Sequence, residues 1–223
     1  MTDLNFSARA HDRILKVSRT LADLDRDVRV GTCSLRRGAQ LRSLRPDLQI
    51  VTLRGNLDTR LRKLKDPDEN LAAIILAAAG VRRLGLEGHI SEFLDPGRML
   101  PAVAQGALCI EMRFEDPHVA QLVAVLNHEP SRTVVMAERA FLRRLGGSCQ
   151  VPVAGHGNLQ DGRLSLSGLV ADLDGRTVLR DTVAGEPADA EALGRALAGR
   201  LLDQGGRQIL KTLSAGALEH ESR

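Results

Sequence analysis

The sequence predicts two domains: an α/β domain with a mostly parallel sheet, followed by a small α+β domain in which helices accompany a three-stranded antiparallel sheet. Two observations predict this arrangement. In the first half of the chain, short strand patterns alternate with helical patterns, which is typical of a layered α/β structure. After residue 127, strand patterns are grouped together and separated by Asp-Gly dipeptides, which are typical of hairpins. At 223 residues, 43% of them hydrophobic, the chain is long enough to bury substantial cores.

Strands and helices alternate through the first domain. Its first helix follows a Thr-Cys-Ser start and must end at Pro46, because proline disfavours a helical conformation in the residue before it. The third strand is apolar almost throughout and is therefore expected to be buried on both faces. The predicted strands cover 27–32, 48–53 and 71–80, and the predicted helices cover 33–46 and 56–65. Short helical pieces are expected at 81–86 and 90–94, and a loop leading into another strand at 100–113.

The second domain begins with helices and continues with strands. Two helices are predicted at 116–128 and 131–147, the second ending at a Gly-Gly pair, the usual helix terminator. Three strands follow, with turns at Asp161–Gly162 and Asp174–Gly175, before an amphipathic helical stretch at 187–213. The predicted strands cover 151–159, 162–172 and 176–185.

Positive charge is concentrated in one part of the chain. The net charge is +3, but residues 31–65 contain nine basic residues against two acidic ones. Such a local excess indicates an anionic partner, with a solvated basic face as the plainer alternative. Four Phe and no Tyr or Trp argue against stacking on nucleobases.

The rest of the composition predicts a cytoplasmic protein. We find no signal-peptide pattern and no apolar run long enough to span a bilayer, so no membrane partner is expected. Three widely spaced cysteines do not form a disulfide pattern and fit a reducing compartment. No metal site is expected.

Candidate ligand-binding residues follow the predicted strands. Thr32 and Ser34 stand where the first strand meets the first helix, and a helix start offers unpaired N–H groups to an anion. Arg54 follows the second strand, and Arg60 lies one turn into the next helix. Guanidinium groups grip carboxylates in a bidentate manner, so this edge of the sheet predicts a pocket for a polyanion. The other arginines of this edge are Arg36, Arg37, Arg82 and Arg83.

Four sequence stretches carry a resemblance to a known family. They are VGTCSLRRGAQLRSLRPDLQIVTLRGNLDTRLRKL, IILAAAGVRRLGL, LPAVAQGALCIEMR and ERAFLRRLGGSCQVPVAG. In this order they resemble the porphobilinogen deaminase (hydroxymethylbilane synthase) family, over about nine tenths of the chain from Leu21 onward. The resemblance implies a periplasmic-binding-protein-like fold for the sheet domain. It also implies a transferase of tetrapyrrole and haem biosynthesis.

The resemblance implies a covalent dipyrromethane cofactor, held through a thioether bond to Cys149. Porphobilinogen units add to the cofactor one after another with loss of ammonia, until a linear tetrapyrrole of four units is released by water. The implied partners are therefore porphobilinogen and the growing polypyrrole, with no nucleic acid. The implied cofactor-binding residues are Cys149, Thr32, Ser34, Arg36, Arg37, Arg54 and Gly55, and the implied substrate-binding residues are Arg60, Arg83 and Gln105. Cys33 and Cys109 are interpreted as ordinary thiols, although the family usually has Ser where Cys33 stands, and Cys109 is expected to begin a strand.

The chain departs from the family pattern in its N-terminal part. The family has three domains, and its catalytic aspartate lies in an H-S-x-K-D motif of the first domain that this sequence does not contain. We therefore assign no catalytic residue and expect impaired activity unless an N-terminal domain is supplied separately. The expected organisation is a linker remnant at 1–25, the cofactor- and substrate-binding α/β domain at 26–106, a segment at 107–126 that would complete the absent domain, and the C-terminal domain at 127–223. The segment 107–126 is expected to leave an apolar face uncovered.

Two alternatives remain beside the enzyme. One is a non-catalytic module that binds a tetrapyrrole or another polycarboxylate through the same arginines and cysteine. The other takes the basic strand ends as a phosphate or nucleic-acid site, which the scarcity of aromatic residues disfavours.

Overall fold

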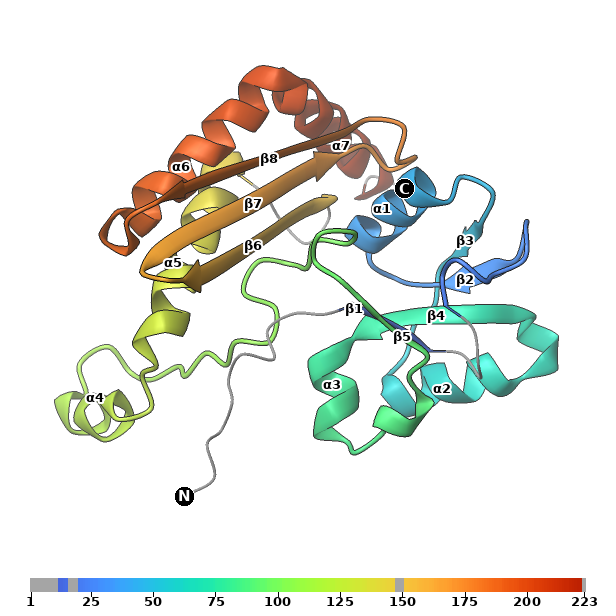
Figure 1. Ribbon diagram of the computed structural model, residues 1–223, viewed down its shortest axis with the longest axis horizontal. Coiled ribbons are helices and arrows are strands. Elements are labelled where there is room, and N and C mark those ends of the chain that lie inside the picture. The colour runs from blue at the N-terminus through green and yellow to red at the C-terminus, as the bar shows by residue number, and fades with distance from the viewer. Residues whose placement is uncertain (1–11, 16–19, 147–150, 222–223) are drawn as a thin grey trace.

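The computed structural model describes residues 12–15, 20–146 and 151–221. Two domains lie side by side, and helix α1 lies where they meet (Figure 1). The first domain is built on a five-stranded sheet of order β3-β2-β4-β1-β5, and the second on a three-stranded antiparallel sheet of order β6-β7-β8. The predicted combination of an α/β domain and an α+β domain is confirmed at this level. No helix within the described ranges is both long and apolar enough to cross a membrane.

The first sheet is mixed rather than mostly parallel. Strands β3, β2 and β4 run parallel, whereas β1 pairs antiparallel with both β4 and β5. Its strands are β1 (Asp12–Leu15), β2 (Arg29–Gly31), β3 (Gln49–Val51), β4 (Leu71–Ala77) and β5 (Glu92–Leu94). Strand β1 lies within the stretch 1–25 that is expected to be linker, and it adds two antiparallel pairings to the sheet.

Two of the sequence predictions in this domain are wrong. The stretch 90–94 is not helical, because β5 gains its hydrogen bonds from β1, a partner far away in the sequence. No strand forms across 100–113, so Cys109 does not begin one. The buried strand predicted at 71–80 ends at Ala77, where α3 begins.

Helices cover both faces of the first sheet. Their boundaries follow local signals: the Ser34 side chain caps α1, Asn56 caps α2, and α1 ends just before Pro46. Ala73 and Ile75 of β4 pack with Leu41 of α1 on one face, whereas Ile74 and Leu76 point to the other face. The helices are α1 (Leu35–Leu44), α2 (Leu57–Lys65) and α3 (Ala78–Arg83), with 3-10 turns at Pro67–Glu69 and Glu87–His89.

The second domain matches its predicted elements closely. Helix α5 ends at Gly146, which adopts the left-handed conformation with φ +64°, as the Gly-Gly signal predicts. The hairpin turns fall at Gly162 and Gly175, both with positive φ. The elements are α4 (Pro117–Ala124), α5 (Glu129–Leu145), β6 (Val153–Gln160), β7 (Arg163–Ala171), β8 (Val178–Gly185), a 3-10 turn (Pro187–Asp189), α6 (Ala190–Leu201), a π turn (Leu202–Gly206) and α7 (Arg207–Glu221).

The three-stranded sheet is buried on one face and partly covered on the other. Helices α5 and α6 cover one face, where Phe141 and Leu197 pack against alternate residues of β7. The opposite face contributes Leu169 and Ala171 to a small apolar cluster that also contains Ala39 of α1 and Leu100. The second domain is therefore docked on α1 of the first domain (Figure 1).

Large apolar side chains are exposed in the stretch 107–126, which follows the first domain in the sequence. Phe114 is 98% exposed and Val125 is 83% exposed, and they lie in the stretch that contains α4. The other exposed apolar residues of this stretch are Leu108, Ile110, Leu122 and Leu126. The uncovered apolar face expected for 107–126 is thus present in the structure.

Candidate functional site

The carboxyl ends of the three parallel strands meet at one edge of the first sheet. Gly31, the last residue of β2, pairs with Val51 of β3 and with Ile74 of β4. The Thr32 N–H continues the ladder by donating to the Val51 carbonyl at 3.0 Å. The residues that directly follow β2 and β3 therefore lie next to each other at the edge where open α/β sheets bind ligands.

The start of helix α1 forms the centre of this edge. The buried Thr32 accepts a hydrogen bond from the Ser34 N–H at 3.2 Å, and Ser34 in turn caps the helix by accepting from the Arg37 N–H at 3.4 Å. The first turn of α1 contains no acidic residue, so its partial positive charge is not offset there. The buried Arg36 and Arg37 follow in the same turn. Such a helix start is suited to a carboxylate or a phosphate.

Arg36 brings two of the predicted site residues together. Its guanidinium is buried and donates to the Leu100 carbonyl through Nη1 and to the Gln105 Oε1 through Nη2, the latter at 3.2 Å. Gln105 lies in the segment that runs from the first domain toward the second. The implied cofactor-binding Arg36 and the implied substrate-binding Gln105 are thus direct neighbours.

A second group forms around Arg60 of α2. Arg60 donates from Nε to the Gly55 carbonyl at 2.7 Å and from Nη2 to the Cys33 sulfur at 3.3 Å. Gly55 has φ +122°, and a Cβ there would lie 2.8 Å from Thr59 Cγ2, so this tight turn requires glycine. Cys33, interpreted from the sequence as an ordinary thiol, is exposed at this same edge. The sequence did offer a signal for this location, because Cys33 directly follows a predicted strand.

The remaining arginines differ in how they relate to this edge. Arg54 is exposed just beyond β3, at the edge itself. Arg83 is exposed in the last turn of α3, so a whole short helix separates it from the end of β4. Its neighbour Arg82 stacks over the Phe93 ring at 5.4 Å. The structure therefore places Arg54 with the strand ends and sets Arg83 apart from them.

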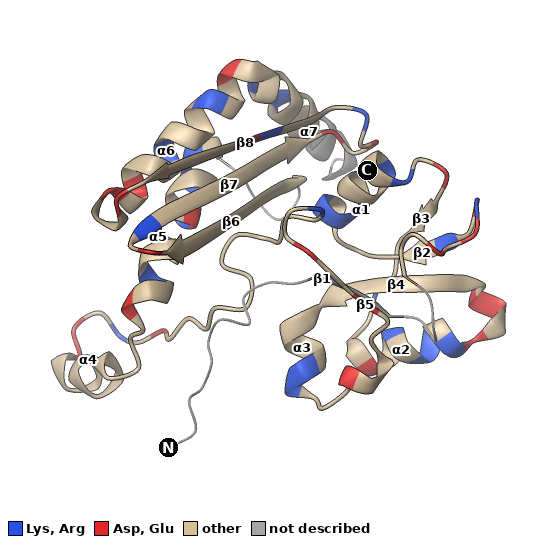
Figure 2. Cartoon of the chain, in the orientation of Figure 1, with Lys and Arg blue, Asp and Glu red and all other residues tan. Residues whose placement is uncertain are grey.

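Arg45 stabilises the fold rather than the site. Its guanidinium grips the Asp47 carboxylate at 2.6 and 2.8 Å and also donates to the carbonyls of Leu21 and Leu24. This hydrogen-bonded pairing lowers the pKa of Asp47 to about 2. Arg45 therefore anchors the chain before β2 to the end of α1. Lys and Arg residues, coloured blue, occur along both α1 and α2 in Figure 2.

Cys149 lies outside the described residues. The described chain resumes at Val151, two residues before β6, and Ala154 of β6 packs in the same apolar cluster as Ala39 of α1. Before Cys149 in the sequence, helix α5 ends at Gly146. The strand that follows Cys149 in the sequence is thus packed against the helix whose start forms the candidate site.

Two buried polar side chains were not singled out in the sequence. Gln40 on α1 is 3% exposed and Glu138 on α5 is 4% exposed. Both bind backbone groups of the segment 100–105: Gln40 binds those of Leu100, and Glu138 binds that of Ala104. Their positions on the inward faces of amphipathic helices were a signal, because a polar residue there must find partners inside the protein.

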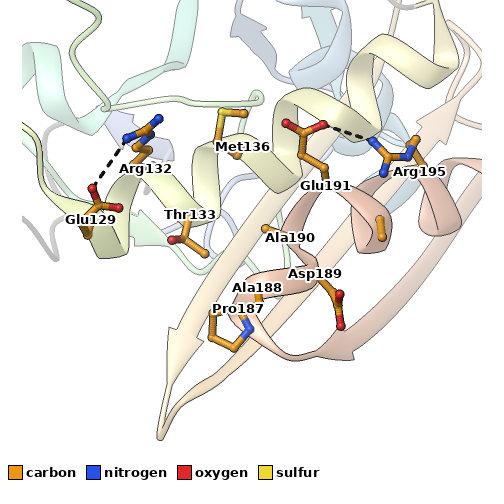
Figure 3. A pocket seen from close by; sticks show the side chains of 11 residues that line it. Glu129, Arg132, Thr133, Met136, Pro187, Ala188, Asp189, Ala190, Glu191 and Arg195 are labelled. Atoms are coloured by element: carbon orange, nitrogen blue, oxygen red, sulfur yellow. Dashed lines mark hydrogen bonds and ion pairs between the residues drawn. The ribbon is translucent and has the colours of Figure 1, made fainter.

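A shallow groove of about 520 Å³ lies elsewhere, between the start of α5 and the start of α6 (Figure 3). Two ion pairs lie within its lining: Arg132 lies 3.7 Å from Glu129, and Arg195 lies 3.1 Å from Glu191. None of the predicted site residues that the structure describes lines this groove. Within the described ranges, no three His, Cys, Asp or Glu side chains are grouped to hold a metal ion.

Comparison with known proteins gives the same relatives for both domains. Residues 5–121 match the family model "Porphobilinogen deaminase, dipyromethane cofactor binding domain", and residues 132–203 match "Porphobilinogen deaminase, C-terminal domain". The chain is 50% identical over 200 residues to porphobilinogen deaminase of Pelobacter propionicus, an alignment that covers 90% of this chain and 64% of that protein. It is 52% identical over 191 residues to porphobilinogen deaminase of a Roseiflexus species, covering 86% and 62%. The chain thus spans a little under two thirds of the length of these relatives, and it belongs to the porphobilinogen deaminase family.

Proposed function

We propose that this chain acts as a hydroxymethylbilane synthase that holds a dipyrromethane cofactor on Cys149 and extends it by four porphobilinogen units. The observation that carries this proposal is the joint edge of β2 and β3, where the start of α1 and the arginine side chains lie together. Arg37, Arg54 and Arg60 supply positive charge there. The bound cofactor would supply the anchored pyrrole end to which new units are added.

The residues present fit a polycarboxylate. Every pyrrole unit of the cofactor and substrate carries an acetate and a propionate, so the ligand gains negative charge with each addition. The N–H groups at the start of α1 can donate to one carboxylate, and guanidinium groups such as that of Arg60 can bind others in a bidentate manner. The glycine turn at Gly55 keeps the backbone of this edge open to a bulky chain.

Cys149 provides the point of attachment. Its sulfur would form a bond to the methylene carbon of a pyrrole unit while the carbon–nitrogen bond of that unit breaks, and the nitrogen would leave as ammonia with the thiol proton. One end of the polypyrrole would then be fixed near α1, because β6, which follows Cys149 in the sequence, packs on that helix. The other end would remain able to move along the arginine side chains as the chain grows.

Intact-mass measurement after incubation with porphobilinogen tests the attachment. We expect the wild-type chain to gain the mass of a dipyrrole and Cys149→Ala to gain none. Cys109→Ala is the matched control, because it removes another thiol, one that is exposed, and it should label like the wild type. The proposal fails if the wild type gains no mass, or if labelling persists without Cys149.

A pair of variants on one helix tests the arginine edge. Arg60 donates hydrogen bonds at the edge, whereas Arg62 is exposed two residues further along α2. Arg60→Met should slow adduct formation by about ten-fold or more, the scale of one lost charge-assisted hydrogen bond. Arg62→Met removes the same charge and should change the rate by less than about two-fold. Equal losses in both variants would mean that only the overall charge attracts the substrate.

Uroporphyrin formation from the released product, after acid and light, tests turnover. Accumulation of uroporphyrin with porphobilinogen as the only substrate would establish the transferase activity. Adduct formation without uroporphyrin would instead leave the chain as a non-catalytic module that binds polycarboxylates.

A further inference from the structure

The segment 100–105 crosses between the domains and is bound on its first-domain side by one amide side chain. Gln40 accepts a hydrogen bond from the Leu100 N–H at 2.8 Å and donates to the Leu100 carbonyl at 3.0 Å. Its Nε2 also donates to the Arg36 carbonyl at 3.3 Å. Gln40 therefore fixes both polar groups of Leu100 against α1.

The same carbonyl orients the guanidinium of Arg36. The Leu100 carbonyl accepts from Arg36 Nη1 as well as from Gln40, and Gln105 Oε1 accepts from Arg36 Nη2. Both of these acceptors belong to the crossing segment. Any movement of this segment would move the Arg36 guanidinium with it.

The crossing segment is also bound on its second-domain side. Glu138 of α5 accepts from the Ala104 N–H at 2.6 Å and from the Gly157 N–H of β6 at 2.7 Å. The Pro101 carbonyl accepts from the Gly155 N–H of β6 at 3.1 Å. Because α5 precedes Cys149 and β6 follows it in the sequence, the bonds at both ends of the segment connect the elements on either side of Cys149 with Arg36.

We propose that Gln40 is a positioning residue that acts through Leu100 on Arg36 and so keeps the Arg36 guanidinium at the start of α1, where the polypyrrole carboxylates bind. Gln40 is itself 3% exposed, so its influence on a ligand passes through its neighbours. The inference rests on the proposed function, because it concerns how the same edge binds its ligand.

A double-mutant cycle on adduct formation tests the proposal. The rate of mass gain from porphobilinogen is measured for the wild type, Gln40→Met, Arg36→Met and the double variant. Each single change should lower the rate by about ten-fold, on the scale of one hydrogen bond to a charged group. If Gln40 acts through Arg36, the double variant should be no slower than Arg36→Met alone.

A loss that multiplies in the double variant would overturn the inference, because a residue that only supports the fold would contribute independently of Arg36. Gln49→Met is the matched control: it makes the same change at an exposed position of β3 and should leave the rate unchanged. If Gln40→Met does not fold, Gln40→Glu replaces it in the same cycle, since the carboxylate keeps the bond from the Leu100 N–H and loses the one to the carbonyl. Labelling of the wild type reports the proposed function separately, and a wild type that does not label would overturn both proposals.

Discussion

The contact between the hairpin turn of β7–β8 and helix α1 can be tested with one methyl group. Gly175 in this turn has φ +69°, and a Cβ built there would lie 2.3 Å from the Ala39 carbonyl oxygen and 2.9 Å from Arg42 Cβ. The first of these atoms is backbone, which cannot rotate away. Gly175→Ala should therefore push the second domain away from α1.

The size of the effect follows from two separate costs. A left-handed conformation costs a residue with a Cβ about 1–2 kcal/mol. Forcing a methyl group into a closely packed contact costs about 1–3 kcal/mol more. The free energy of unfolding of Gly175→Ala should thus fall by about 2–5 kcal/mol.

Gly162 provides the matched control in the other hairpin turn of the same sheet. It has φ +74° but no atom within 4 Å of its Cβ position, so Gly162→Ala should incur only the conformational cost of about 1–2 kcal/mol. Urea unfolding of both variants followed by circular dichroism measures the difference, and a changed dependence on urea would indicate separate unfolding of the domains. Equal losses in the two variants would refute the close approach of this turn to α1.

Three further changes test other parts of the structure. Glu138→Gln should lower the free energy of unfolding by about 1–3 kcal/mol, because the amide keeps one acceptor oxygen for two backbone N–H groups, one buried and one half-buried. Urea unfolding would show no loss if these bonds were absent. Asp47→Asn should make the free energy of unfolding depend less on pH in acid. The lowered pKa of Asp47 means that its pairing with Arg45 contributes fully above about pH 4 and is lost as the pH falls through about 2. Thermal unfolding between pH 5 and pH 2 measures this, and unchanged acid sensitivity would contradict it. The double change of Phe114 and Val125 to Ser should reduce self-association in analytical ultracentrifugation and shift stability by less than about 0.5 kcal/mol, whereas a large loss of stability would mean that these side chains are buried in solution.

Local signals predicted most of the fold. The Ser34 cap, the proline after α1 and the Gly-Gly pair after α5 place helix boundaries within a few residues, because capping and backbone geometry are decided by neighbours in sequence. Strand β5 could not be predicted in this way. Three residues show no clear period, and the strand exists because β1, about eighty residues earlier, offers it hydrogen bonds.

The same distinction between local signals and long-range contacts applies to the candidate site. Residues that follow strands, such as Ser34 and Arg54, could be predicted because parallel strands end at a common edge. The partners of Arg36 could not be predicted, since Leu100 and Gln105 lie 64 and 69 residues away in the sequence. The sequence indicated only that Arg36 is one of several arginines that could bind the ligand. In the structure its guanidinium also holds the segment that joins the domains.

Helix α1 connects ligand binding with the contact between the domains. Its first turn forms the candidate site, Gln40 in its middle holds the crossing segment, and Ala39 touches the turn at Gly175. A change that displaces the second domain from α1 should therefore disturb the start of the helix, although Gly175 is not part of the site. We expect Gly175→Ala to slow adduct formation with porphobilinogen by about three- to ten-fold, and Gly162→Ala to leave it unchanged, under conditions where both variants are fully folded. Intact-mass kinetics measure both rates, and a wild-type rate in Gly175→Ala would show that the site forms independently of how the second domain is docked.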